Sequence, residues 1–119
     1  MPTPLIDPIF DGLARALDVH NRRHDVLATN LANVETPGFR AQEVDFRSAL
    51  ARAFERTEEA TRPADVIEDA SAPARADGNT VDLDLQMAKL AENAGRYTAL
   101  TRILGKRIGL VRLAIDGGR

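Results

Sequence analysis

The chain has 119 residues and a net charge of -2, which corresponds to one domain and does not favour nucleic-acid binding. It contains four Phe, one Tyr, no Trp and no Cys, so disulfides and cysteine-ligated metals are excluded and helices are favoured over sheets. No run approaches the roughly 20 apolar residues that span a bilayer. The first residues also lack the cationic start and apolar core of a secretory signal. We therefore expect a soluble, all-α protein that is not membrane-embedded and has no cleavable signal peptide.

A first long helix is predicted from Pro8 to about Asn33. Asp7 suits the N-cap, and Pro8 suits the first helical position, where a missing N–H costs nothing. The residues of one face recur at alternating steps of three and four, which is typical of a coiled-coil seam. They are Phe10, Leu13, Leu17, His20, His24, Leu27 and Leu31. Pro37 disfavours helix in the preceding residue, and residues 36–39, Thr-Pro-Gly-Phe, predict a type II turn with Gly38 at positive φ.

The middle of the chain divides into two pieces. Residues 44–54 place Phe46, Leu50 and Phe54 on one face after a possible Asp45 cap, which predicts a short amphipathic helix. Residues 55–79 carry seven acidic residues against three arginines and are rich in Ala, Thr and Pro. This composition predicts a flexible polar segment without fixed structure of its own.

A second long helix of roughly 33 residues is predicted to begin near Leu83 and to end before Gly117 and Gly118. The alternation of Val and Leu with Asp over residues 81–85 is also compatible with a short strand, so the start of this helix stays open. Its seam again has steps of four and three. The seam comprises Leu83, Met87, Leu90, Ala94, Tyr97, Thr101, Leu104, Ile108, Val111 and Ile115.

The two seams predict that the terminal helices pair as in an antiparallel coiled coil, within three regions: 1–40, 41–79 and 80–119. The second helix has a further apolar strip, and a two-helix hairpin cannot cover all of this surface. That second packing face comprises Leu100, Ile103, Leu110 and Leu113. Gly95, Gly105 and Gly109 also favour assembly over a monomer, because each costs about 1 kcal/mol in a helix and suits close approach of another backbone.

His20 and His24 are the only candidates for metal binding or acid–base chemistry. Their HxxxH spacing fits zinc, but the intervening residues supply no catalytic Glu. Both lie on the seam, where hydrogen bonding or pH-sensitive packing is a sufficient explanation. We expect no metal, no cofactor, no small-molecule substrate and no enzymatic activity. The basic cluster Arg102, Lys106, Arg107 and Arg112 is interpreted as a solvated helix face and not as a nucleic-acid site.

The residues that end the first helix, NLANVETPGFRA at 30–41, resemble the signature of the bacterial flagellar axial family of rod, hook and hook-associated proteins. The motif positions are Asn30, Ala32, Asn33, Thr36, Pro37, Gly38 and Phe39. Residues 78–115, which begin GNTVDLDLQMAKL, resemble a proximal-rod member of that family. The short middle region supports this member, since larger axial proteins carry big domains between their terminal helices.

The resemblance implies a structural subunit of the basal-body rod. Its terminal helices would polymerise, transmit torque across the periplasm and line the export channel. It also implies export through the flagellar type III apparatus, and as partners the rod proteins FlgC and FlgF, the adaptor FliE, the export gate and other copies of the chain. Two alternatives stay open from the residues alone. One is a cytosolic coiled-coil adaptor or regulator, and the other is a small metal-dependent enzyme built on His20 and His24.

Overall fold

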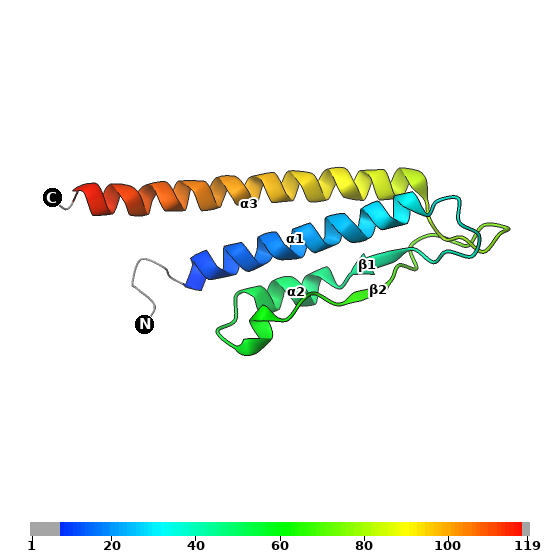
Figure 1. The fold of residues 1–119 in the computed structure, drawn as a ribbon, viewed down its shortest axis with the longest axis horizontal. Coiled ribbons are helices and arrows are strands. Elements are labelled where there is room, and N and C mark those ends of the chain that lie inside the picture. The colour runs from blue at the N-terminus through cyan, green and yellow to red at the C-terminus, as the bar shows by residue number, and fades with distance from the viewer. Residues whose placement is uncertain (1–7, 118–119) are drawn as a thin grey trace.

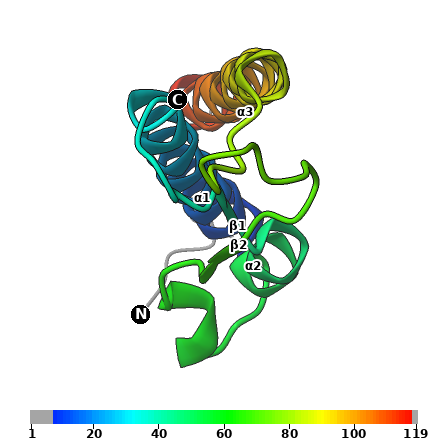
Figure 2. The same ribbon diagram turned by 90° about the vertical axis from the view of Figure 1, so that its right-hand side faces the viewer.

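The computed structural model describes residues 8–117 and shows an elongated molecule of 68 × 26 × 17 Å. Its elements in chain order are α1 (Pro8–Ala32), β1 (Gln42–Val44), α2 (Phe46–Ala53), the 3₁₀ helix η1 (Glu58–Thr61), β2 (Val66–Glu68) and α3 (Leu83–Gly117). Residues 42–68, from β1 to β2, are called the outer segment below. Figures 1 and 2 show α1 lying between α3 on one side and the outer segment on the other. The molecule therefore has three layers, with α1 in the middle.

The two long helices begin and end close to the predicted residues. α1 starts at Pro8 and ends one residue before Asn33, while the predicted cap at Asp7 lies outside the described residues. α3 starts at Leu83, so the stretch 81–85 is not a strand. The Asp82 carboxylate accepts a hydrogen bond from the Leu85 N–H at 3.0 Å, which satisfies one of the free donors of the first turn. In Figure 1 the C-terminal end of α3 extends past the start of α1.

The all-α prediction is wrong in one respect, because the outer segment contains a two-stranded antiparallel sheet. β1 and β2 pair with Gln42 opposite Glu68, Glu43 opposite Ile67 and Val44 opposite Val66. Each strand has three residues, too few for the alternation of apolar and polar residues that identifies a strand in a sequence. The rest of residues 8–117 is helical or irregular, and the long N- and C-terminal helices are confirmed.

The segment 55–79 also departs from its prediction, since it contains η1 and β2 and makes defined contacts. The short helix α2 is present as predicted, but the Asp45 side chain forms no cap hydrogen bond. The backbone N–H of Asp45 instead donates to the Asp65 carbonyl at 2.8 Å, which extends the strand pairing to the start of α2. Local composition did not reveal these contacts because their partners are 20 or more residues away.

The apolar core is small and lies between α1 and the outer segment. Val19 of α1 forms one buried cluster with Val44, Ala49 and Ala64, and Val26, Phe46 and Leu50 pack against it. Phe54 lies directly on Gly12, where a Cβ atom would be 2.2 Å from the Phe54 ring, so glycine permits this close contact. None of the helices in residues 8–117 is long and apolar enough to cross a membrane.

Candidate functional site

The motif residues that follow α1 form a compact turn, called the exit turn below (residues 33–40). The Asn33 side chain donates to the Thr29 carbonyl at 2.8 Å and accepts from the Thr36 hydroxyl at 3.0 Å. The Phe39 N–H donates to the Thr36 carbonyl at 3.2 Å, and Gly38 has φ +74°. The predicted turn with glycine at positive φ is therefore present. A side chain at this position would be strained because L-residues rarely adopt such a φ.

Asn30 joins α1, β1 and α3 although it belongs to the motif at the helix end. Its side chain is fully buried. The amide group donates to the Gln42 carbonyl at 2.7 Å and to Gln86 Oε1 at 3.0 Å, and its oxygen accepts from the Gln42 N–H at 2.9 Å. Three elements thus meet at one asparagine, and no shorter or apolar side chain satisfies these partners.

Asn79 lies against the exit turn and was not among the predicted site residues. Its side-chain amide donates to three carbonyls, those of Asn33 at 2.9 Å, Val34 at 3.1 Å and Thr36 at 2.8 Å. The Arg75 guanidinium also donates to the Val34 carbonyl. Asn79 belongs to the GNT stretch that resembles the rod proteins, but a single sequence gives no signal that this stretch reaches the first helix.

A polar network crosses the middle of the molecule from α1 to α3. His20 Nδ1–H donates to Asn93 Oδ1 at 2.8 Å, and the Asn93 amide donates back to the His20 carbonyl at 2.9 Å. The edge of the His20 ring meets the Phe46 ring at a centroid distance of 4.8 Å. Burial lowers the pKa of His20. The Asn93 hydrogen bond opposes this shift, and the nearby charges of Arg96 and Arg23 add to it.

Two cations and two carboxylates connect the outer segment, and Asp69 directly after it, to both long helices. Arg23 of α1 forms two hydrogen bonds to the Glu43 carboxylate, at 2.9 and 3.2 Å. Lys89 of α3 lies 2.7 Å from Asp69 and 3.4 Å from Glu43. Burial alone raises the pKa of Asp69, but the hydrogen bonds from Lys89 and Ser71 and the Lys89 charge hold it below its ordinary value. These pairs hold β1 and the residue that follows β2 against α1 and α3.

His24 does not join His20 in a site. It is exposed on α1 whereas His20 is buried, and no group of three or more metal-ligating side chains occurs within residues 8–117.

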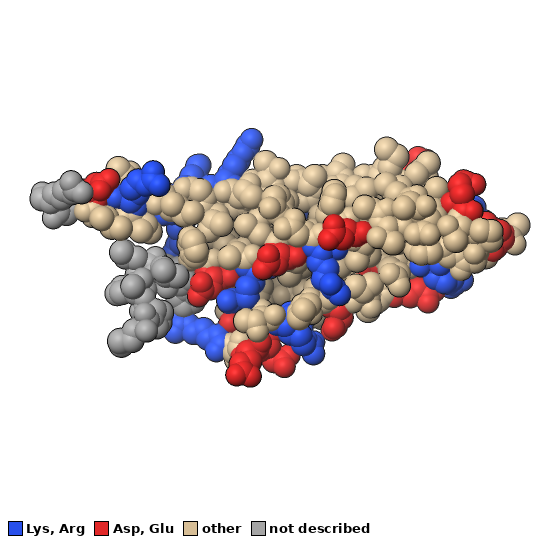
Figure 3. All heavy atoms as spheres, viewed as in Figure 1, with Lys and Arg blue, Asp and Glu red and all other residues tan. Residues whose placement is uncertain are grey.

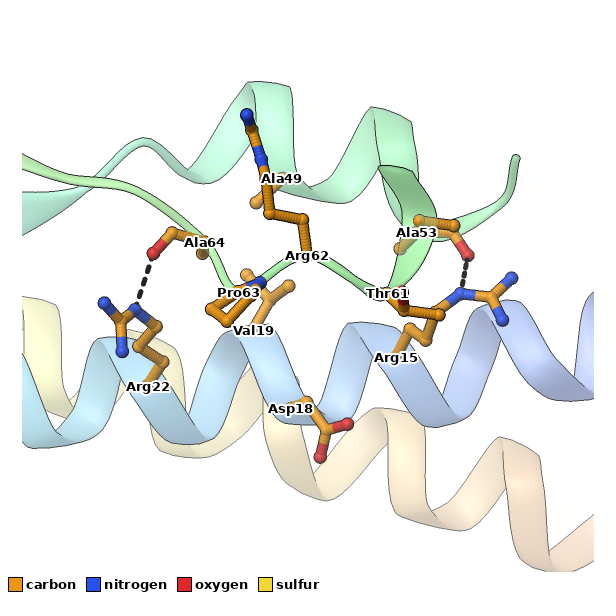
Figure 4. A pocket seen from close by; sticks show the side chains of 11 residues that line it. Arg15, Asp18, Val19, Arg22, Ala49, Ala53, Thr61, Arg62, Pro63 and Ala64 are labelled. Atoms are coloured by element: carbon orange, nitrogen blue, oxygen red, sulfur yellow. Dashed lines mark hydrogen bonds between the residues drawn. The ribbon is translucent and has the colours of Figure 1, made fainter. Parts of the chain in front are cut away.

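A cavity of about 370 Å³ lies between α1, α2 and residues 60–64, with small side chains on its walls (Figure 4). Arg15 donates to the Ala53 carbonyl and Arg22 to the Ala64 carbonyl, both at 2.6 Å, so these arginines hold the outer segment at the two ends of the cavity.

The residues of the predicted assembly seam differ in how far the structure buries them. On α1, Leu13 and Leu27 are buried, and Phe10, Leu17 and Leu31 are partly buried. On α3, Leu90, Tyr97, Leu104 and Val111 are partly buried, but Leu83, Met87 and Ile108 are exposed. The seam was placed on apolar residues alone, whereas α3 turns the polar Gln86 and Asn93 toward α1, and these two are its buried residues. Leu83 and Met87 are therefore left about half exposed in the first turns of α3.

The second packing face lies mostly in solvent. Leu100 is partly buried, while the exposed fractions are 51% for Ile103, 66% for Leu110 and 68% for Leu113. Ile108 and Ile115 add to the apolar surface of the same half of α3. Figure 3 shows that charged side chains of both signs gather over the outer segment, whereas the charged side chains that stand out over the C-terminal half of α3, at the upper left, are mainly Lys and Arg. The apolar surface of α3 is thus uncovered within the described chain.

Several known proteins with similar sequences carry the same description. The chain is 30% identical to the flagellar basal body rod protein FlgB of Salmonella typhimurium, over 87% of this chain and 89% of that protein. It is 34% identical to FlgB of Cereibacter sphaeroides, over 87% and 91% of the two chains, and 28% identical to FlgB of Proteus mirabilis, over 95% and 97%. No protein-family model matches the chain. These similarities extend over nearly the whole length of each relative, and the chain belongs to the family of the flagellar basal body rod protein FlgB.

Proposed function

We propose that the chain is a structural subunit of the proximal flagellar rod and that it polymerises through its terminal helices. Membership of the FlgB family supports the rod, and the uncovered apolar surface of α3 supports polymerisation. Large exposed apolar patches mark interaction surfaces in soluble proteins. Within residues 8–117, seven of the ten exposed large apolar residues belong to α3, so this helix is the principal assembly element. A cytosolic coiled-coil adaptor is not favoured, because nothing in that role accounts for the family relationship.

The proposal assigns different tasks to the three layers. Residues 1–40 and 80–119 supply the axial helices that form the inner layer of the rod, transmit torque across the periplasm and line the export channel. Residues 41–79 form the outer part of the subunit. The exit turn then sets the direction in which the chain leaves α1 for the outer segment. The polar network supports this division, because it fixes the outer segment to both axial helices without using the apolar surface of α3.

The proposed partners are other copies of the chain, the rod proteins FlgC and FlgF, the adaptor FliE and the type III export gate. Subunits of a polar rod contact neighbours on several sides, so the interfaces are heterologous and use different patches on each subunit. Exposed apolar residues on more than one line of α3, such as Leu83, Ile103 and Ile108, suit such contacts. The basic side chains Arg102, Lys106 and Arg112 lie among them and are exposed.

The test is whether the chain is retained in purified basal bodies. Cells expressing a tagged copy as their only source are extracted with detergent and alkali, and the rod fraction is probed for the tag. We expect retention of the unsubstituted chain. Absence from basal bodies that are otherwise complete rejects the rod assignment and restores the adaptor.

The interface is tested by substitutions that leave the fold intact. Leu110→Asp combined with Leu113→Asp places charges on the uncovered surface and is expected to prevent incorporation, because assembly then buries unpaired carboxylates. Ile67→Asp is the matched control, since Ile67 is 49% exposed but belongs to β2 of the outer segment. Normal incorporation of the α3 variant argues against polymerisation through this surface, even if the rod assignment stands.

A further inference from the structure

The exit turn is held from outside by residues 75–81, called the clasp below. The last carbonyls of a helix have no partners within the helix and need donors from elsewhere. The carbonyls of Asn33, Val34 and Thr36, which follow α1, all accept a hydrogen bond from one Asn79 amide. Each also accepts a second bond, from the Thr36 N–H, the Arg75 guanidinium and the Phe39 N–H respectively. Asn79 is fully buried, so water does not replace these bonds without opening the turn.

The same contact is extended by backbone bonds on both sides of Asn79. The Gly38 N–H donates to the Asp77 carbonyl at 2.9 Å, and the Thr80 N–H donates to the Phe39 carbonyl at 3.0 Å. The Ala41 N–H donates to the Thr80 hydroxyl at 2.8 Å. Asn79 completes the clasp by accepting from the Val81 N–H at 2.7 Å through its side-chain oxygen. Besides the Asn79 bonds, three hydrogen bonds thus join residues 38–41 to residues 77–80.

Two glycines with positive φ meet where the segments cross. Gly38 has φ +74° and Gly78 has φ +84°, and a Cβ atom at Gly78 would lie 3.5 Å from the Gly38 Cα. By contrast, the side chains of the motif residues that follow α1 form few hydrogen bonds that hold the turn in place. The Asn33 and Thr36 side chains bond only to each other and to Thr29, and both bonds are exposed to solvent.

We propose that Asn79 is the positioning residue of the exit turn and that the TPGF motif has no fixed geometry without it. The direction of the chain at the end of α1 is then set by a residue of the clasp, which precedes α3 in the sequence. This inference rests on the proposed function only for its consequence, namely that the clasp gives the rod subunit its shape. Its physical content concerns the isolated chain and is tested there.

The test compares amide hydrogen exchange in four purified chains: the unsubstituted protein, Asn79→Ala, Asn79→Asp and Asn33→Ala. Asn79→Asp keeps the size of the side chain and its acceptor for Val81 but cannot donate to the three carbonyls. We expect the amides of Gly38 and Thr80 to exchange at least about tenfold faster in both Asn79 variants, because the three carbonyls lose the Asn79 amide that joins them to the clasp. The central amides of α1 and α3 should keep their protection, since Asn30–Gln86 and His20–Asn93 remain paired.

Asn33→Ala is the control at the motif itself and is expected to change exchange at Gly38 by less than about threefold. The proposal is overturned if Asn33→Ala opens the turn and Asn79→Ala does not, because the motif then fixes itself. Tolerance of Asn79→Asp shows that Asn79 acts by filling space, which also contradicts the proposal. Global unfolding of Asn79→Ala, seen as loss of helical circular dichroism, rejects the local role of the clasp. Basal-body retention of the unsubstituted chain is scored separately, so failure of the rod assignment leaves this result unaffected.

Discussion

The two halves of α3 differ in the kind of side chain that they present to the rest of the chain. The first half buries Gln86 and Asn93, whose amides bond to Asn30 and His20 of α1. The second half leaves Ile103, Leu110 and Leu113 more than half exposed. Buried hydrogen bonds specify one arrangement, because leaving a partner unpaired is costly, whereas apolar surface is non-directional and fits several neighbours. One half of the helix therefore defines the subunit, and the other half is available for assembly.

The strongest way to break this distinction is to place a charge in the subunit-defining region. Leu27 is fully buried in α1, and Leu27→Asp should lower the free energy of unfolding by at least about 3 kcal/mol, measured by urea denaturation. Ile108→Asp, on a seam position that is 43% exposed, should cost less than about 1 kcal/mol. Equal losses for the two variants would mean that the C-terminal half of α3 is also part of the folded core.

Removing an amide from the polar network should have the next largest effect. Asn93→Ala leaves the buried His20 Nδ1–H without its partner and removes the second hydrogen bond to the His20 carbonyl. We expect a loss of about 2 kcal/mol in the free energy of unfolding. Thr98→Ala, one turn later on the exposed side of α3, serves as the control and should stay within about 0.5 kcal/mol. A small effect of Asn93→Ala would show that water replaces these bonds.

The protonation of His20 should make stability depend on pH in a defined direction. Its pKa is lowered in the folded chain, so the unfolded chain binds more protons below about pH 6.5. Stability is therefore complete above that pH and falls as the pH decreases toward the folded pKa. The pKa of Asp69 is held below its ordinary acidic value, so Asp69 keeps its charge between pH 7.5 and 5.5.

Urea denaturation at pH 7.5 and 5.5 measures this effect in three chains. The unsubstituted protein and His24→Gln should lose stability at the lower pH, because His24 is exposed and takes no part in the network. His20→Gln should show a smaller pH dependence. An unchanged dependence in His20→Gln would assign the titration to another group.

The smallest effect on folding is expected for the surface that matters most for assembly. Leu110→Asp and Leu113→Asp together should change the free energy of unfolding by less than about 0.5 kcal/mol, because both side chains are about two-thirds exposed. Sedimentation of the purified chain at increasing concentration should show less self-association than for the unsubstituted chain. A large loss of stability would mean that this surface is covered within the subunit.

Much of the fold could be predicted because its signals are local. The apolar spacing of the two long helices, Pro8 at the start of α1 and Gly38 in the exit turn are features of neighbouring residues. The sheet could not be predicted, since each strand of three residues depends on a partner more than 20 positions away. The polarity of the α1–α3 contact was missed for a different reason: an apolar pattern cannot show that Gln86 and Asn93 are buried with partners on another helix.

The candidate site shows the same limit at the level of single residues. Thr36, Pro37 and Gly38 were predicted from turn chemistry and lie where expected. Asn79 was not predicted, because its role depends on three backbone carbonyls, and any residue has a carbonyl. Only the path of the chain in three dimensions shows which carbonyls an amide meets.

The hydrogen bonds between the exit turn and the clasp also affect how the subunit tolerates changes in the length of the segment between them. The Gly38 N–H and the Asp77 carbonyl are 2.9 Å apart, so the residues between them form a loop with fixed ends. The entropic free-energy cost of closing such a loop grows slowly, by roughly 0.6 kcal/mol for each doubling of its length. Insertions at the exposed residues 55–59 would then leave the register of α1 and α3 unchanged. On this reasoning, the segment between the two long helices can accept an additional domain without a change in how the helices pair.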